Sequence, residues 1–185
     1  MKRLKNILII ILFIIYAGGV LAGAVREIKM PNDSEMYEYL ENGIDAYDTA
    51  ATSGVKTTAT DNLKIFSLLV LGGLFKPFIW LIAVAMLIKG YFTGFSVMAA
   101  LRLYGIRGLL ICIPNIISAT VLIPASIYYG GLNGSGLLTG QKSGFYKKFL
   151  WATIFLFAIF CADTLIKGAA SPIFVKWASK LFKAT

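Results

Sequence analysis

Residues 77–100 read PFIWLIAVAMLIKGYFTGFSVMAA, an apolar run that carries a single charge, that of Lys89. A helix of about 20 apolar residues crosses the hydrocarbon core of a bilayer, because it satisfies its backbone hydrogen bonds internally. This run therefore predicts a membrane-spanning helix. Comparable runs lie on both sides of it, at about residues 7–24, 62–75, 108–130 and 149–168.

The composition agrees with a protein that lies mostly in lipid. The 185 residues are 58% hydrophobic with a mean hydropathy of +0.76, which leaves no room for a large soluble domain. We predict an all-α fold: one polytopic integral membrane domain over residues 1–185, with about five transmembrane helices. Residues 25–61 form a short acidic outer segment, and residues 171–185 form a C-terminal interfacial helix. The last helix is expected in the interface plane because lysines follow one of its sides and apolar residues another.

The charges predict an orientation in the cell membrane. Lys2, Arg3 and Lys5 precede the first run, so the positive-inside bias places the N-terminus in the cytoplasm. The following segment, 25–61, holds eight of the nine acidic residues, and the net charge of +9 therefore belongs almost wholly to the membrane part. This distribution predicts membrane lipid, and not nucleic acid, as a partner. Residues 1–24 also fit a secretory signal peptide, because Ala22-Gly23-Ala24 has the small-x-small form of a cleavage site.

Two readings of the acidic segment stay open. Met36, Leu40 and Ile44 recur at helical spacing, which predicts an amphipathic helix, while the surrounding Thr, Ala and Ser residues are typical of a mobile solvated loop. In either case its acids are the candidates for contact with an outer partner. They are Glu35, Glu38, Glu41 and Asp45.

The run at 62–75 is short for a span. Lys76-Pro77 ends it at a length of roughly 21 Å, so it either crosses the membrane tilted or re-enters on one side. Five crossings put seven Lys and Arg residues inside and ten outside, whereas four crossings put nine inside and seven outside, a slight preference for re-entry. Residues 130–144 are rich in glycine and predict a flexible connection between helices.

Catalytic chemistry is not expected. The chain has no histidine, which excludes histidine-based acid–base catalysis and histidine metal ligands. Cys112 and Cys161 fall inside apolar runs and are expected to pack as free thiols. We predict no enzyme activity, no cofactor and no metal site.

Ionisable groups at membrane depth mark either a buried pair or a transport pathway. The candidates are Lys89, Asp163 and Lys167, and Asp163 precedes Lys167 by the four residues that place both on one helix face. In the structural interpretation the two lysines reach towards lipid headgroups, and Asp163 pairs with one of them.

Small residues and prolines are the candidates for helix packing. Gly19 and Gly23, like Gly90 and Gly94, have the four-residue spacing that lets helices approach closely in lipid, within this chain or in a homo-oligomer. Pro114 and Pro124 each remove a backbone hydrogen bond and predict a kinked or locally unwound helix, with Asn115 among its possible polar partners.

Several elements occur in an order that resembles the stage II sporulation protein M family. They are Asp61-Asn62-Leu63-Lys64, Leu87-Ile88-Lys89-Gly90 with Gly94, Ile113-Pro114-Asn115, Ile123-Pro124-Ala125, and Ser171-Pro172 before Lys176-Trp177. The resemblance covers nearly the whole chain. It implies about five spans and a non-catalytic membrane scaffold of the sporulation engulfment complex. Such a scaffold recruits and localises the peptidoglycan-degrading enzymes, stage II sporulation proteins D and P. The alternative from the residues is a small permease or membrane subunit of a transporter, with Lys89, Asn115 and Asp163 along a polar path.

Overall fold

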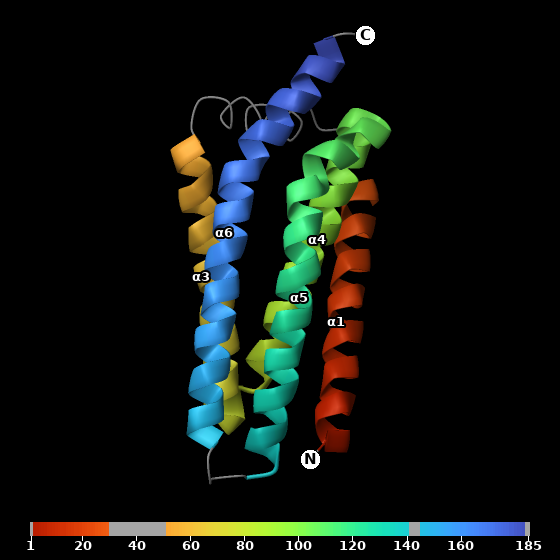
Figure 1. Ribbon diagram of the computed structural model, residues 1–185. Coiled ribbons are helices and arrows are strands. Elements are labelled where there is room, and N and C mark those ends of the chain that lie inside the picture. Colours follow the sequence, from red (N-terminus) through yellow and green to blue (C-terminus); the bar gives the residue numbers. More distant parts are fainter. Residues whose placement is uncertain (1, 30–50, 141–144, 184–185) are drawn as a thin grey trace.

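The computed structural model describes residues 2–29, 51–140 and 145–183, which are almost entirely helical (Figure 1). Two 3-10 turns, η1 (Lys76–Phe78) and η2 (Gly105–Arg107), precede the helices that begin at Trp80 and Gly108. No strand occurs in these ranges, so the all-α prediction is confirmed. The long helices are α1 (Lys2–Lys29), α3 (Ala51–Leu74), α4 (Trp80–Tyr104), α5 (Gly108–Leu138) and α6 (Phe145–Lys183).

Among the described residues, four stretches are long and apolar enough to cross a membrane. They are Arg3–Lys29, Lys76–Arg102, Cys112–Leu138 and Phe145–Gly168. By length and composition the chain is therefore a multi-pass membrane protein, as predicted. The segment α3 is not among the four.

The boundaries of α3 differ from the prediction. The helix begins at Ala51 and not at residue 62, and its 24 residues give it a length of about 36 Å. Residues 51–61 were expected outside the membrane helix because of their polar composition, but α3 extends through them. Residues 25–29 likewise continue α1. The rest of the predicted outer segment, with Glu35, Glu38, Glu41 and Asp45, lies outside the described residues.

Successive helices alternate in direction along the chain, so α1, α4 and α6 run parallel to one another and α3 and α5 run the opposite way (Figure 1). In Figure 1 α3 descends beside the rising α6, and α5 descends between α6 and α1. The N-terminus and the C-terminus lie at opposite ends. Lys29 and Ala51, which flank the undescribed part of the acidic segment, lie at the end where α6 finishes.

Glycine residues near the end of α5 are part of the helix core. The prediction of a flexible connection over residues 130–144 is wrong for 130–138, because α5 continues to Leu138. A Cβ atom added to Gly131 would meet Ile9 Cγ1 at 2.5 Å, and one added to Gly130 would meet Ile82 Cγ2 at 2.6 Å. The absence of side chains therefore lets α5 approach α1 and α4 closely, which outweighs the low helix propensity of glycine.

Two proline-containing segments also remain helical. Of the two forms predicted at Pro114 and Pro124, a kinked or a locally unwound helix, local unwinding does not occur, because α5 is helical through both. The predicted helix at 171–185 is the continuation of α6, which passes Ser171 and Pro172 and ends at Lys183. Each proline removes one backbone bond, and the bonds on both sides are enough to maintain the helix.

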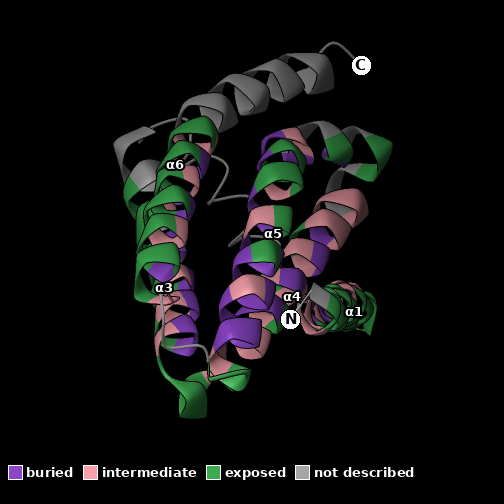
Figure 2. Ribbon diagram, turned by 60° about the horizontal axis from the view of Figure 1, so that its bottom comes forward, coloured by how far each residue is buried: buried purple, intermediate pink, exposed green. Residues whose placement is uncertain are grey.

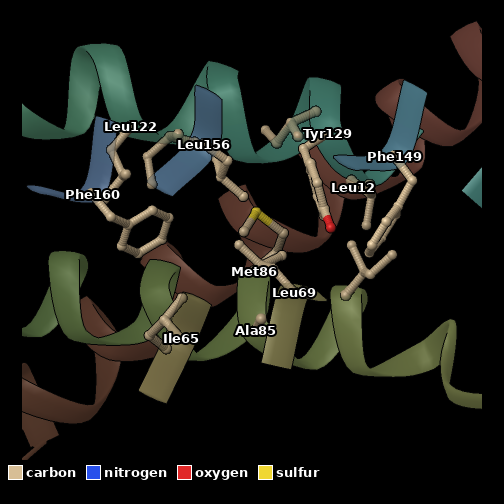
Figure 3. Packing of buried hydrophobic residues seen from close by; sticks show 13 residues of the cluster. Leu12, Ile65, Leu69, Ala85, Met86, Leu122, Tyr129, Phe149, Leu156 and Phe160 are labelled. Atoms are coloured by element: carbon tan, nitrogen blue, oxygen red, sulfur yellow. The ribbon is translucent and has the colours of Figure 1, made fainter. Parts of the chain in front are cut away.

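The interior is apolar and is formed by four helices around Met86 (Figure 3). Leu69, Met86, Leu122 and Leu156 are at most 1% exposed and come from α3, α4, α5 and α6. Leu12 adds a contribution from α1. Helix α1 lies at the edge of the bundle, and many of its residues are exposed (Figure 2). In a membrane these exposed residues face lipid or another protein.

The hydroxyl of Tyr129 provides a polar contact inside this interior. Its oxygen lies 3.1 Å from Thr153 Oγ1, and Tyr129 is 2% exposed.

We expect Tyr129→Phe to lower the free energy of unfolding by about 1 kcal/mol, because the Thr153 hydroxyl loses its partner. Thermal unfolding in detergent, followed by tryptophan fluorescence, measures the change. The neighbouring Tyr128 is exposed and holds Lys5 over its ring at 4.8 Å, an interaction that phenylalanine keeps, so Tyr128→Phe is the control. Equal effects of both substitutions would contradict the role of the hydroxyl.

Candidate functional site

Five polar residues from α3, α4 and α6 meet inside the helix bundle. We call Asn62, Lys89, Asp163, Thr164 and Lys167 the polar cluster. Asn62 Nδ2 donates to Asp163 Oδ2 at 2.5 Å and to Thr164 Oγ1 at 3.0 Å. Lys89 Nζ donates to Asn62 Oδ1 at 3.2 Å. The amide of Asn62 therefore connects α3 to both α4 and α6.

The predicted ion pair on α6 is present in the cluster. Lys167 Nζ lies 3.2 Å from Asp163 Oδ2, and the side chains are 14% and 2% exposed. Their separation by four residues places them on one face of α6. Lys89 does not bond to Asp163 directly but reaches it through Asn62. Sequence reasoning identified the three charged residues but did not select Asn62 as a site residue, although Asn62 stands in the element Asp61-Asn62-Leu63-Lys64 that contributes to the family resemblance.

The charges of the polar cluster lie deep within the apolar stretches, where ionised groups are energetically unfavourable. Lys89 is the middle residue of the apolar stretch Lys76–Arg102. Ionisable groups at such a depth are rare and pair with one another or line polar cavities. Lys89 and Lys167 carry two positive charges and Asp163 carries one negative charge, which leaves the cluster with one excess positive charge. Nearby Asp61 lies outside the polar cluster and forms its own pair with exposed Lys64 at 3.2 Å.

Two cavities adjoin the cluster on different sides. The first has a volume of about 120 Å³, and we call it the polar cavity. Its polar lining residues are Lys89, Thr93, Ser96, Asn115 and Lys167. The second, of about 80 Å³, is lined by Asp163, Ser118 and apolar residues of α5 and α6. Asp163 therefore faces the second cavity, while both lysines face the polar cavity.

Two oxygens at the second cavity lack a hydrogen-bond partner among the described residues. They are Asp163 Oδ1 and Ser118 Oγ, in residues that are both 3% exposed. Buried polar groups without protein partners are usually satisfied by water, and this cavity has room for water. The arrangement therefore fits a hydrated carboxylate that interacts on its other side with Lys167 and Asn62.

The predicted packing glycines meet between α1 and α4. A Cβ atom on Gly19 would meet Leu87 O at 2.5 Å, and one on Gly23 would meet the nitrogen of Phe95 at 2.8 Å. A Cβ atom on Gly90 would overlap the backbone of Tyr16, and one on Gly94 would overlap the backbone of Val20. The structure thus places all four glycines at one internal contact of two parallel helices, and this contact lies within a single chain.

An ion pair closes the end of this contact near the acidic segment. Arg102 Nη1 donates to the backbone oxygen of Glu27 at 2.8 Å and lies 3.6 Å from its Oε1. Glu27 is 6% exposed. The sequence suggested only that Glu27 belongs to the acidic outer segment, because nothing in the chain order indicates that the ends of α1 and α4 meet.

The remaining candidates are spread along α5 and α6. Pro114 is buried, while Asn115 and Pro124 are exposed. Cys112 and Cys161 are both free thiols. Cys161 also lines an apolar groove of about 380 Å³ between α3 and α6. Within the described ranges, no group of three or more His, Cys, Asp or Glu residues is placed to hold a metal ion.

Comparisons with known proteins found no relative. No protein-family model matches the chain, and neither a curated protein nor a solved structure matches it. The resemblance to the stage II sporulation protein M family therefore stays a prediction from the residues.

Proposed function

We propose that the protein is a non-catalytic scaffold of the cell membrane that recruits and localises peptidoglycan-degrading enzymes during sporulation engulfment. Its partners would be the stage II sporulation proteins D and P, as the family resemblance implies. The observation that carries the proposal is the position of the acidic segment: Lys29 and Ala51, between which it lies, are at one end of the bundle (Figure 1). Both attachments of the segment are therefore on the side that would face the cell wall.

The basic start of the chain supports this orientation, whereas the whole count of Lys and Arg for five crossings, seven inside and ten outside, does not. Residues with positive charge gather at the opposite end, where α1 and α6 begin and α3 and α5 end. In the described residues they are Lys2, Arg3, Lys5, Lys76, Lys147 and Lys148. A cluster of Lys and Arg without acidic residues is typical of the cytoplasmic side. We place the N-terminus there and propose α3 as a fifth crossing, since its length of about 36 Å exceeds a hydrocarbon core of about 30 Å.

Internal packing supports a structural role. The four glycines bring α1 and α4 into backbone contact, and the polar cluster joins α3, α4 and α6. Of the charged groups that sequence reasoning offered for transport, Asp163 pairs with Lys167, and Lys89 reaches Asp163 through Asn62. A bundle joined in this way holds the two attachments of its outer segment at a fixed separation, which suits a surface that collects partner proteins.

Affinity purification tests the scaffold. We expect tagged protein from native membranes in mild detergent to recover peptidoglycan hydrolases. Neutralising Glu35, Glu38, Glu41 and Asp45 together should reduce that recovery about tenfold, because each exposed charge pair contributes up to about 1 kcal/mol. A control variant, with Asp33→Asn and Asp48→Asn in the same segment, should recover nearly as much as the wild type. Recovery that is unchanged in the fourfold variant, at equal protein in the membrane, would remove these residues from the contact.

A transport function is the second candidate, and the polar cavity beside Lys89 and Lys167 favours it. Alternating access would require a path through the apolar core formed by Leu69, Met86 and Leu122. Proteoliposomes with the wild-type protein, compared with protein-free liposomes, distinguish the two functions. Saturable uptake that depends on the protein would favour a transporter, and an inert membrane would favour the scaffold.

A further inference from the structure

The polar cavity has an uneven distribution of charge. Lys89 and Lys167 line it, and the carboxylate of Asp163 lies at the other cavity, on the far side of the cluster. Lys89 donates one bond to Asn62 and Lys167 interacts with Asp163, so each ammonium group keeps further N–H donors. The two lysines lie close enough for their charges to repel each other.

The excess positive charge of the polar cluster calls for a balancing negative charge. A buried charge without a partner is costly, because the hydrocarbon around the helices cannot solvate it. An anion in the polar cavity would balance the charge and separate the two ammonium groups. Asn115 adds an amide group to the lining, while the hydroxyls of Thr93 and Ser96 donate to the backbone oxygens of Lys89 and Phe92.

The cavity is accessible from the membrane side of the bundle. Phe92 and Ile116 at its edge are 61% and 45% exposed, and they lie where the helices face lipid. Along α4 the lining extends from Lys89 to Ser96, a rise of about 10 Å towards the end that carries the acidic segment. Ser96 is about 9 Å before Arg102, where the apolar stretch ends. Lys89 is about 20 Å before Arg102, so a headgroup from the adjacent leaflet would have to bring its phosphate about that far along α4 to reach Lys89.

We propose that the polar cavity between α4, α5 and α6 binds a phosphate group, carried either by an anionic phospholipid or by a free phosphate ion. Phosphate oxygens accept charge-assisted hydrogen bonds from lysine, and the volume of about 120 Å³ accommodates a tetrahedral group. The proposal does not depend on the scaffold function, since it rests on the charges and the space inside the bundle.

Two measurements distinguish the sources of phosphate. Native mass spectrometry of protein extracted from nanodiscs of phosphatidylcholine and phosphatidylglycerol counts retained lipids. If a lipid binds, the wild type keeps phosphatidylglycerol in preference to phosphatidylcholine, and Lys89→Gln reduces that retention about tenfold. If a free ion binds, inorganic phosphate raises the unfolding temperature of the wild type in phosphatidylcholine nanodiscs, and Lys89→Gln removes the rise.

Control variants keep the test decisive. Lys64→Gln removes an exposed lysine on α3 that lies outside the cavity, and it should behave like the wild type. Asn115→Leu fills the mouth of the cavity at an exposed position, so it should weaken binding even where Lys89→Gln fails to fold. Wild-type protein that retains both lipids equally and does not respond to phosphate overturns the proposal. An equal loss of binding in Lys64→Gln also overturns it, because the attraction would then be general.

Discussion

Gly94→Leu is expected to separate α1 from α4 and to lower the free energy of unfolding by about 3 kcal/mol or more. A Cβ atom at this position would stand 2.7 Å from the carbonyl carbon of Val20 and 2.9 Å from its Cα. These are backbone atoms of a helix, so they cannot rotate away as the end of a side chain would. The larger leucine side chain can be accommodated only if the two helices move apart.

Gly18→Leu is the matched control for this experiment. Gly18 is exposed on α1, and no atom lies within 4 Å of a Cβ added there. The same change of residue type should therefore leave stability almost unchanged, apart from a small gain in helix propensity. Thermal unfolding of both variants in the same detergent gives the comparison. Equal midpoints would show that α1 and α4 do not need their close contact.

Asp163→Asn is expected to lower the free energy of unfolding by about 3–5 kcal/mol, the usual cost of removing one partner from a buried ion pair. Asp163 is the only acidic residue of the polar cluster, and Lys167 would keep a side chain that is 14% exposed without an opposite charge. The second lysine, Lys89, would add to the uncompensated charge. Reversible unfolding in mixed detergent and SDS measures the loss.

The exposed pair on α3 provides the control for Asp163→Asn. Asp61 and Lys64 are 66% and 70% exposed in their side chains, so Asp61→Asn leaves no buried charge without a partner and should cost much less than Asp163→Asn. Adding Lys167→Met to Asp163→Asn removes both charges of the buried pair and should restore part of the lost stability. If Asp163→Asn and Asp61→Asn have the same effect, the cluster does not hold α6 to its neighbours.

The sequence predicted the helices better than their ends. The apolar runs around residues 7–24, 108–130 and 149–168 fall within α1, α5 and α6, and the run at 77–100 covers most of η1 and of α4. The extension of α5 through Gly130 and Gly131 was missed, because glycine has low helix propensity in isolation. Contact with Ile9 and Ile82 explains why these positions are helical, and the local sequence does not indicate which helices will pack against them.

The candidate site was predicted in part. Lys89, Asp163 and Lys167 were identified because charges in apolar runs are costly, and the spacing of the last two indicated their pair. Asn62 lies far from them in the chain, and it joins the cluster only because α3 packs against α4 and α6. The sequence also could not predict which cavity each charged side chain faces, since this depends on how α5 packs against α6.

By itself the sequence determined that this is an all-helical membrane protein, which charges lie at membrane depth and which glycines can bring helices together. Those properties follow from local composition, because hydrocarbon accepts only helices or closed barrels and penalises each charge separately. Only the tertiary structure decided that Gly19, Gly23, Gly90 and Gly94 meet one another, that Asn62 connects three helices, and that two lysines share a cavity while Asp163 faces another. These facts depend on which helix faces are opposed, and in lipid that choice is made by close packing and hydrogen bonds between segments distant in the chain.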